Sequence, residues 1–127
     1  MTAYLDMGQL VAAARAALGS EPKVSNRRAL LRCVAEPAAA AGGVEIYPEL
    51  ADKAAALMIA VARTHRPFAD GNRRASFVAA ALLLNVNGHR LAMPLPDASA
   101  LIDKVALGEL TEAREVATRM TPHIMPV

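Results

Sequence analysis

The strongest constraint on the fold is a long apolar segment that begins directly after a short, strongly polar run. Between residues 75 and 86 apolar side chains would fall on nearly every side of a helix, namely Phe77, Val78, Leu82, Leu83, Leu84 and Val86. Such a helix must be surrounded by other elements, because apolar surface left in water is unfavourable. The segment therefore predicts a central helix over about residues 73–87, stopped by Asn87 and Gly88.

The composition predicts that the other elements are also helices. Apolar residues make up 54% of the chain, aromatic residues only 3%, and Ala and Leu dominate, which favours packed helices over a sandwich of sheets. At 127 residues the chain has the length of one domain. We therefore expect a single all-α domain over residues 1–127, a compact bundle of about six helices around the central one.

Capping and breaking residues give the expected boundaries of the other helices. The signals are Asp6 with Gln9 and Gly19 around the first helix, Ser25 and Pro37 around the second, Pro48 at the start of the third, Asp97 and Gly108 around the fifth, and Thr111 at the last. We further expect a short helical piece over Ala38–Ala41, extended chain over Arg90–Met93 and a loose tail from Pro122.

Charge, cysteine content and hydropathy exclude several classes of protein. The formal net charge of +2 gives no sign of a strongly electrostatic nucleic-acid binder, so no direct nucleic-acid partner is expected. The single cysteine, Cys33, has no internal disulfide partner, and no signal-peptide pattern opens the sequence, which favours the cytoplasm. The apolar run Ala54–Ala62 is far shorter than the roughly 20 residues of a membrane span. It predicts a core helix.

The polar run His65–Arg74 combines the groups that phosphoryl or nucleotidyl transfer requires. Imidazole changes charge near neutral pH, so His65 is a candidate base. Asp70 offers the hard oxygen ligand that Mg²⁺ prefers, and arginines after a glycine turn suit phosphate oxygens. Each element also has an ordinary interpretation, as a solvated helix end, a turn or surface charge. Their order and spacing between two apolar helices favour the functional interpretation.

This run resembles the signature of the Fic/Doc family, His-x-Phe-x-(Asp/Glu)-Gly-Asn-x-Arg. The residues that carry the resemblance are His65, Pro67, Phe68, Asp70, Gly71, Asn72 and Arg74. Similarity to the short Doc branch extends over most of the chain and includes Gly42-Gly43 through Tyr47-Pro48. Arg73 stands where Fic proteins usually carry a second glycine and Doc proteins typically carry lysine. A cation at that position favours the Doc branch.

The resemblance implies a toxin of a toxin–antitoxin pair that inhibits translation. Doc-like proteins transfer a phosphoryl group from a nucleoside triphosphate such as ATP, with Mg²⁺, to a protein hydroxyl, here a threonine of elongation factor Tu. AMP transfer of the Fic type is the alternative. The implied partner is a small Phd-like antitoxin. By position, the resemblance implies that His65 is the base, Asp70 the metal ligand and Phe68 the residue that anchors the loop. The implied phosphate-binding residues are Gly71, Asn72, Arg73 and Arg74.

The sequence departs from the family pattern at one point. The family has one residue between the histidine and the phenylalanine, whereas this chain has two, Arg66 and Pro67. Counted forward from Tyr47-Pro48, His65 takes the histidine position; counted backward from Asp70, Arg66 takes it. In the first case a bulge before Pro67 absorbs the extra residue and His65 still reaches the site. In the second no base exists, because guanidinium stays protonated, and the protein is a nucleotide- or antitoxin-binding module.

Overall fold

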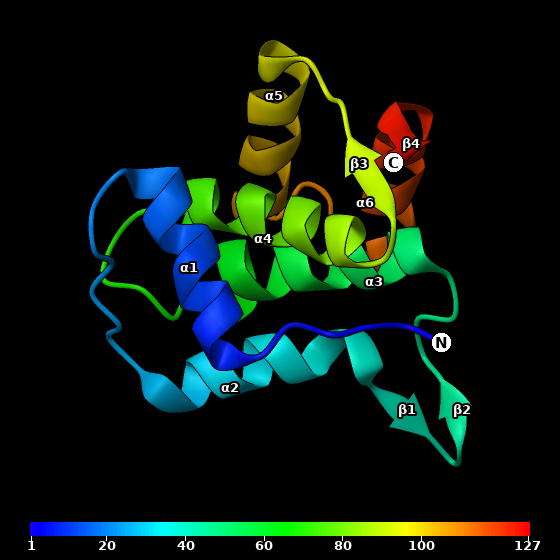
Figure 1. The fold of residues 1–127 in the computed structure, drawn as a ribbon, viewed down its shortest axis with the longest axis horizontal. Helices are drawn as coiled ribbons and strands as arrows, with labels where there is room; N and C mark the ends of the chain where they lie inside the picture. Colours follow the sequence, from blue (N-terminus) through cyan, green and yellow to red (C-terminus); the bar gives the residue numbers. More distant parts are fainter.

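The computed structural model describes residues 1–127 and confirms an all-α fold of six helices. Short turns and two small two-stranded sheets connect them (Figure 1). The helices are α1 (Met7–Leu18), α2 (Arg27–Ala35), α3 (Leu50–Ile59), α4 (Asn72–Val86), α5 (Leu95–Ala106) and α6 (Ala113–Met120). None of them combines the length and the apolar composition that crossing a bilayer requires.

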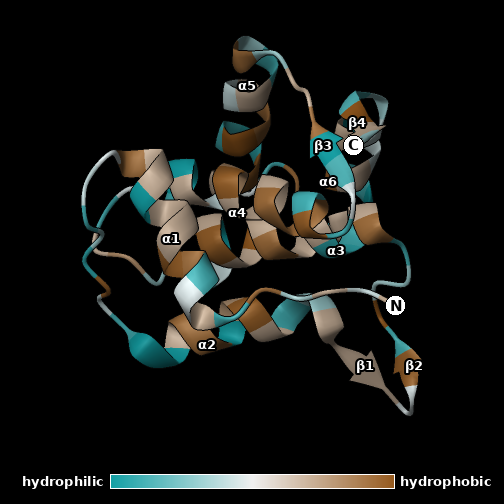
Figure 2. Ribbon diagram, viewed as in Figure 1, coloured by the Kyte–Doolittle hydropathy of each residue, from teal (hydrophilic) through white to brown (hydrophobic).

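Helices α3 and α4 lie side by side in the middle of the molecule, and the others pack around this pair. In Figure 1, α1 crosses α4, α5 rises above α4, and α6 lies near the start of α3. Apolar residues gather where these helices meet, whereas the first turn of α2 is hydrophilic (Figure 2). The loop that joins α3 to α4 is therefore held at one end of the packed core.

The expectation that α4 would be surrounded on nearly every side is only partly met. Its buried side faces the core, but Phe77, Val78 and Leu82 on the other side are half-buried. Helix α3 is the more enclosed of the pair, since all seven residues of Asp52–Met58 are buried. Alanines occupy positions 54–56, and their small side chains allow neighbouring elements to approach closely.

Helix α1 has the predicted boundaries, whereas several other helix starts differ by a few residues. Asp6 and Gln9 form the capping box of α1, and Gly19 ends it in a left-handed conformation. The other N-terminal caps are Asn26 rather than Ser25, Glu49 after Pro48, Pro94 rather than Asp97, and Glu112 after Thr111. For α5 the reason is that Pro96 lies within the first turn, where a missing N–H costs nothing.

The structure corrects two expectations about the irregular segments. Ala38–Ala41 is not a helical piece: after a 3₁₀ turn (Glu36–Ala38), strands β1 (Ala40–Ala41) and β2 (Val44–Glu45) form a hairpin. Gly42 and Gly43, at φ 58° and 80°, make the turn that joins the strands. The tail is not loose either, because β4 (Ile124–Pro126) pairs antiparallel with β3 (His89–Leu91), which overlaps the segment Arg90–Met93 expected to be extended.

A buried lysine fastens the hairpin to α3. The Lys53 side chain is 2% exposed, and its Nζ donates to Glu45 Oε1 at 2.9 Å and to the Pro37 carbonyl at 3.3 Å. The same Nζ lies 5.4 Å from the centre of the Tyr4 ring. Burial acts to lower the pKa of Lys53, but its interactions with Tyr4 and Glu45 outweigh burial and raise the pKa. Lys53 is therefore charged and links α3 to the hairpin and the N-terminal segment.

We predict that Lys53→Met loosens the hairpin while changing the global stability little. Methionine fills a similar volume without the cost of burying a charge, and Glu45, 53% exposed, becomes hydrated when it loses its partner. The free energy of unfolding should change by about 1 kcal/mol or less. Hydrogen exchange of the amides at Val44–Ile46 should accelerate, and Lys104→Met on α5 serves as the control. Unchanged exchange would show that Lys53 does not hold the hairpin.

Candidate functional site

The polar loop between α3 and α4 is held against the segment before α2. The Pro67 carbonyl accepts hydrogen bonds from the Ser25 amide at 2.9 Å and the Ser25 hydroxyl at 3.2 Å. The Ala69 amide donates to the Lys23 carbonyl at 2.8 Å. Pro67 is fully buried and Phe68 is 2% exposed, so Phe68 anchors the loop in the core. These contacts fix the path of the loop on both sides of Pro67.

A π-helical turn, Ala60–Thr64, continues α3 into this loop. The His65 amide donates to the Ala60 carbonyl at 2.8 Å, a bond across five residues instead of the four of an α-helix. A π turn therefore takes up one more residue than an α turn. Arg66 follows with a φ of 44°, and no other non-glycine residue of the chain has a positive φ. The turn and the left-handed Arg66 together absorb the extra residue of the motif.

His65 and Arg66, the two residues that could take the histidine position of the motif, differ in their surroundings. His65 is half-buried and lines a cavity, whereas Arg66 is exposed and lines no cavity of appreciable size. This arrangement, with His65 at a cavity and Arg66 exposed, is the one expected if a bulge before Pro67 takes up the extra residue.

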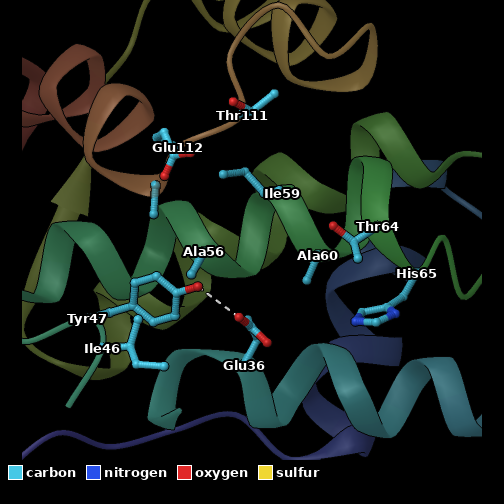
Figure 3. A pocket seen from close by; sticks show the side chains of 11 residues that line it. Glu36, Ile46, Tyr47, Ala56, Ile59, Ala60, Thr64, His65, Thr111 and Glu112 are labelled. Atoms are coloured by element: carbon cyan, nitrogen blue, oxygen red, sulfur yellow. Dashed lines mark hydrogen bonds between the residues drawn. The ribbon is translucent and has the colours of Figure 1, made fainter. Parts of the chain in front are cut away.

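The cavity beside His65, which we call the His65 cavity, has a volume of about 320 Å³. It runs along α3 between the hairpin side and the segment before α6 (Figure 3). Its eleven lining residues are Glu36, Ile46, Tyr47, Ala56, Ile59, Ala60, Thr64, His65, Thr111, Glu112 and Ala113. The floor is apolar, and the polar groups stand around it.

Two carboxylates and a phenol give the His65 cavity its electrostatic character. The Tyr47 hydroxyl donates to Glu36 Oε1 at 2.8 Å. Burial, followed by the hydrogen bond and charge of Glu36 and the charge of Glu112, raises the pKa of Tyr47 to about 12. Tyr47 is therefore neutral at physiological pH. Neither Glu36 nor Glu112 has a lysine, arginine or histidine partner within 4 Å.

The side chain of Asn72 holds the backbone of the loop in place. It is 4% exposed; its Oδ1 accepts from the Phe68 amide at 3.0 Å and its Nδ2 donates to the Phe68 carbonyl at 2.8 Å. The side-chain amide thus bonds in both directions to the backbone of a buried loop residue. Only the backbone N–H of Asn72, at the start of α4, is left to face an anion.

The remaining polar residues of the motif surround the start of α4 but do not line the His65 cavity. Asp70 is exposed and makes no hydrogen bond or ion pair in the structure, and Arg74 is likewise exposed and unpaired. Arg73 Nη1 pairs with Asp103 Oδ1 on α5 at 2.9 Å, with both side chains about half exposed. The π turn also contacts α5, since Arg63 Nη1 lies 3.5 Å from the Ala106 carbonyl.

Gly71 allows the loop to pass close to the end of α1. It has a φ of 75°, and a Cβ built on it would lie 2.3 Å from Leu18 Cδ2. A side chain at this position would meet both backbone strain and a steric clash. The close approach brings the first turn of α4, with its unpaired N–H groups, to the surface beside Arg74 and Asp70.

The structure contains no other candidate for a metal or nucleophile site. No three His, Cys, Asp or Glu side chains come together in a way that would hold a metal ion by themselves. Cys33 is buried, and burial, followed by the charge of Glu36, raises its pKa to about 12, so the thiol is protonated and unreactive.

The sequence did not reveal Glu36, Tyr47 and Glu112 as members of the site. They come from three segments that are far apart in the chain, and only the fold brings them to the same cavity. Tyr47, before Pro48, carried a signal only as part of the family resemblance. Nothing in the sequence around Glu36 or Glu112 separates them from solvent-exposed helix ends.

Comparisons with known proteins agree with the resemblance. Residues 4–84, which include the whole polar run, match the model of the Fic/DOC family. The chain is also 45% identical over 92 residues to a protein named Toxin Doc from Mycolicibacterium smegmatis. That match covers 72% of this chain and 70% of the relative.

We predict that Asn72→Ala destabilises the protein by about 2–4 kcal/mol, because it leaves the buried N–H and C=O of Phe68 without partners. Chemical denaturation measures the loss. Asn72→Asp should be at least as destabilising, because it buries a carboxylate and places one of its oxygens against the Phe68 carbonyl. A loss below about 1 kcal/mol for Asn72→Ala would contradict the assigned role.

At Arg66 we predict that one substitution increases the stability of the fold. Glycine adopts the left-handed conformation without strain, so Arg66→Gly should stabilise the fold by about 0.5–1 kcal/mol. Arg66→Val, which places a β-branched side chain at positive φ, should destabilise it by about 1 kcal/mol or more. Equal stability of the two variants, measured by urea denaturation, would mean that residue 66 is not left-handed in solution.

Proposed function

The chain belongs to the Fic/DOC family, and from this we propose that it is a Doc-like toxin that transfers a phosphoryl group from a nucleoside triphosphate to a protein hydroxyl. The observation that carries the proposal is the position of His65. The π turn keeps its ring at the rim of a cavity despite the extra residue in the motif. A base that faces a cavity can come within hydrogen-bond reach of a hydroxyl bound there.

In the proposed reaction His65 acts on the acceptor side. It takes the proton of a serine or threonine hydroxyl as the oxygen attacks the γ-phosphorus of ATP. The bond between that phosphorus and the oxygen bridging to the β-phosphate breaks, and ADP leaves with the bonding electrons. The proton remains on His65 until solvent removes it. Among the residues that line the cavity, His65 is the one at the histidine position of the family signature, and we therefore assign the proton transfer to it.

The other motif residues act on the nucleotide side. Asp70 fits Mg²⁺, because its carboxylate oxygens have no other partner and Mg²⁺ completes its shell with phosphate oxygens and water. Bound there, the ion would neutralise charge on the phosphates. The N–H groups of Asn72 and Arg73 and the side chains of Arg73 and Arg74 suit phosphate oxygens. Gly71 lets the loop pass close to Leu18, since a Cβ at this position would lie 2.3 Å from Leu18 Cδ2.

The biological setting follows from the relative. Because a protein 45% identical to this chain is named Toxin Doc, we propose that the chain works as the toxin of a toxin–antitoxin pair in the cytoplasm. A Phd-like antitoxin would then be its partner, and a threonine of elongation factor Tu its target, so that modification inhibits translation. Transfer of AMP instead of the phosphoryl group would need the nucleotide to bind in the reverse direction.

We predict that His65→Ala abolishes transfer from ATP but leaves the fold intact. The hydrogen bond from residue 65 to Ala60 uses the backbone amide, which alanine retains. The test is transfer of label from ATP to proteins of a bacterial lysate with Mg²⁺, with label on either the γ- or the α-phosphate and His123→Ala as the control variant. Label from the γ-position alone supports phosphoryl transfer, and label from the α-position indicates AMP transfer. Full activity of His65→Ala would remove His65 from the mechanism.

Asp70→Asn should weaken the dependence of transfer on Mg²⁺. The amide removes the negative charge while keeping the shape, so the Mg²⁺ concentration for half-maximal rate should rise about tenfold or more. The Mg²⁺ titration is compared with that of Asp97→Asn, which changes an exposed carboxylate on α5. An unchanged titration would contradict the metal-ligand role of Asp70.

A further inference from the structure

The His65 cavity has a charge that the proposed reaction does not explain. Among its eleven lining residues are two carboxylates, those of Glu36 and Glu112, and no lysine or arginine. Neither carboxylate has a lysine, arginine or histidine partner within 4 Å, so no cation of the chain neutralises their charges at close range. The triphosphate does not belong in this cavity, because its charges would face two carboxylates without a cation between them.

The walls of the cavity show what shape and polarity would fit. Ala56 and Ala60 on the floor are 3% and 2% exposed, and Ile59 and Ala113 extend the apolar surface. In Figure 3 Glu36 lies between Tyr47 and His65, and Glu112 lies on the opposite side of α3. A wholly apolar occupant would strip water from these carboxylates without replacing it.

We infer that the His65 cavity binds a lysine or arginine side chain of the acceptor polypeptide, close to the hydroxyl that is modified. This inference rests on the proposed transfer to a protein. The long stems of these side chains pack on apolar surface while the charged heads stay in polar surroundings. An apolar floor with a carboxylate on each side provides both.

The pairing of Tyr47 with Glu36 adds to this interpretation. The hydrogen bond uses Glu36 Oε1 and holds the carboxylate in one orientation, while Oε2 has no partner in the structure. The charges of Glu36 and Glu112 both act on Tyr47, so the two carboxylates create a shared negative potential inside the cavity. Glu36 and Glu112 are thus specificity-determining residues, whereas His65 acts on the hydroxyl.

Short fluorescent peptides that carry one threonine test the inference. Next to the threonine they carry lysine, alanine or glutamate. Binding is measured by fluorescence anisotropy on His65→Ala protein, which binds without transferring. The lysine peptide should bind roughly tenfold more tightly than the glutamate peptide. Equal affinities would overturn the inference.

Three variants test whether the preference for the lysine peptide arises in the His65 cavity. The double variant Glu36→Gln/Glu112→Gln removes both negative charges but keeps side chains of similar shape. It should lose the preference for the lysine peptide. The control Glu109→Gln removes the charge of an exposed acid outside the cavity and should retain the preference for the lysine peptide. Glu112→Lys should shift the preference toward the glutamate peptide. A preference that persists in the double variant would place the selecting charge elsewhere.

The same peptides separate this inference from the proposed function. Binding that prefers lysine, together with absence of label from ATP on any peptide or lysate protein, would support the cavity assignment and overturn the transferase. Transfer that depends on His65 but takes place equally well on all three peptides would support the transferase and overturn the cavity assignment. Transfer that prefers the lysine peptide, with a lower KM and a similar kcat, would support both.

Discussion

The site depends on the double hydrogen bond between the Asn72 side chain and the backbone of Phe68. Phe68 lies in the core, so its N–H and C=O have no access to water and must find partners within the protein. Asn72 supplies both, and it also begins α4. One buried amide therefore sets where the loop ends and where the helix starts, and the positions of Asp70, Arg73 and Arg74 follow from it. The contacts of Pro67 and Ala69 with the segment before α2 complete the restraint.

An extra residue in a loop that is fixed at one end must be absorbed at the other. The downstream side cannot shift, because Phe68 and Asn72 are locked, and the change is therefore taken up where α3 ends. A π turn stores one residue within a helix while preserving most of its hydrogen bonds. The remaining cost is the left-handed backbone of Arg66. Strain of this kind persists only where the surroundings fix the chain firmly, and the buried residues on its C-terminal side do so here.

Residues whose signals are local could be interpreted from the sequence. The capping box at Asp6, the glycine stop at Gly19 and the long apolar segment of α4 each depend on neighbours within a few positions. The hairpin at Gly42-Gly43 was missed because its strands are only two residues long and rich in alanine, which favours helices. The pairing of β3 with β4 was missed for another reason, since it joins segments more than thirty residues apart. The motif indicated His65 and Asp70, but the acids of the His65 cavity reach it only through the fold.

Arg73, which we propose binds the nucleotide, is held in an ion pair with Asp103 of α5. Both side chains are about half exposed, so separating them costs about 1 kcal/mol or less. If Arg73 binds phosphate as proposed, Asp103 neutralises it in the absence of the nucleotide, and a more highly charged anion could displace Asp103 at little cost. Because Arg63 of the π turn also approaches the Ala106 carbonyl of α5, such an exchange would release one of two polar contacts between α5 and the chain around the loop. An anion bound at the start of α4 would thus loosen the polar contacts of α5, while the buried side chains of Leu101 and Val105 keep the helix in the core.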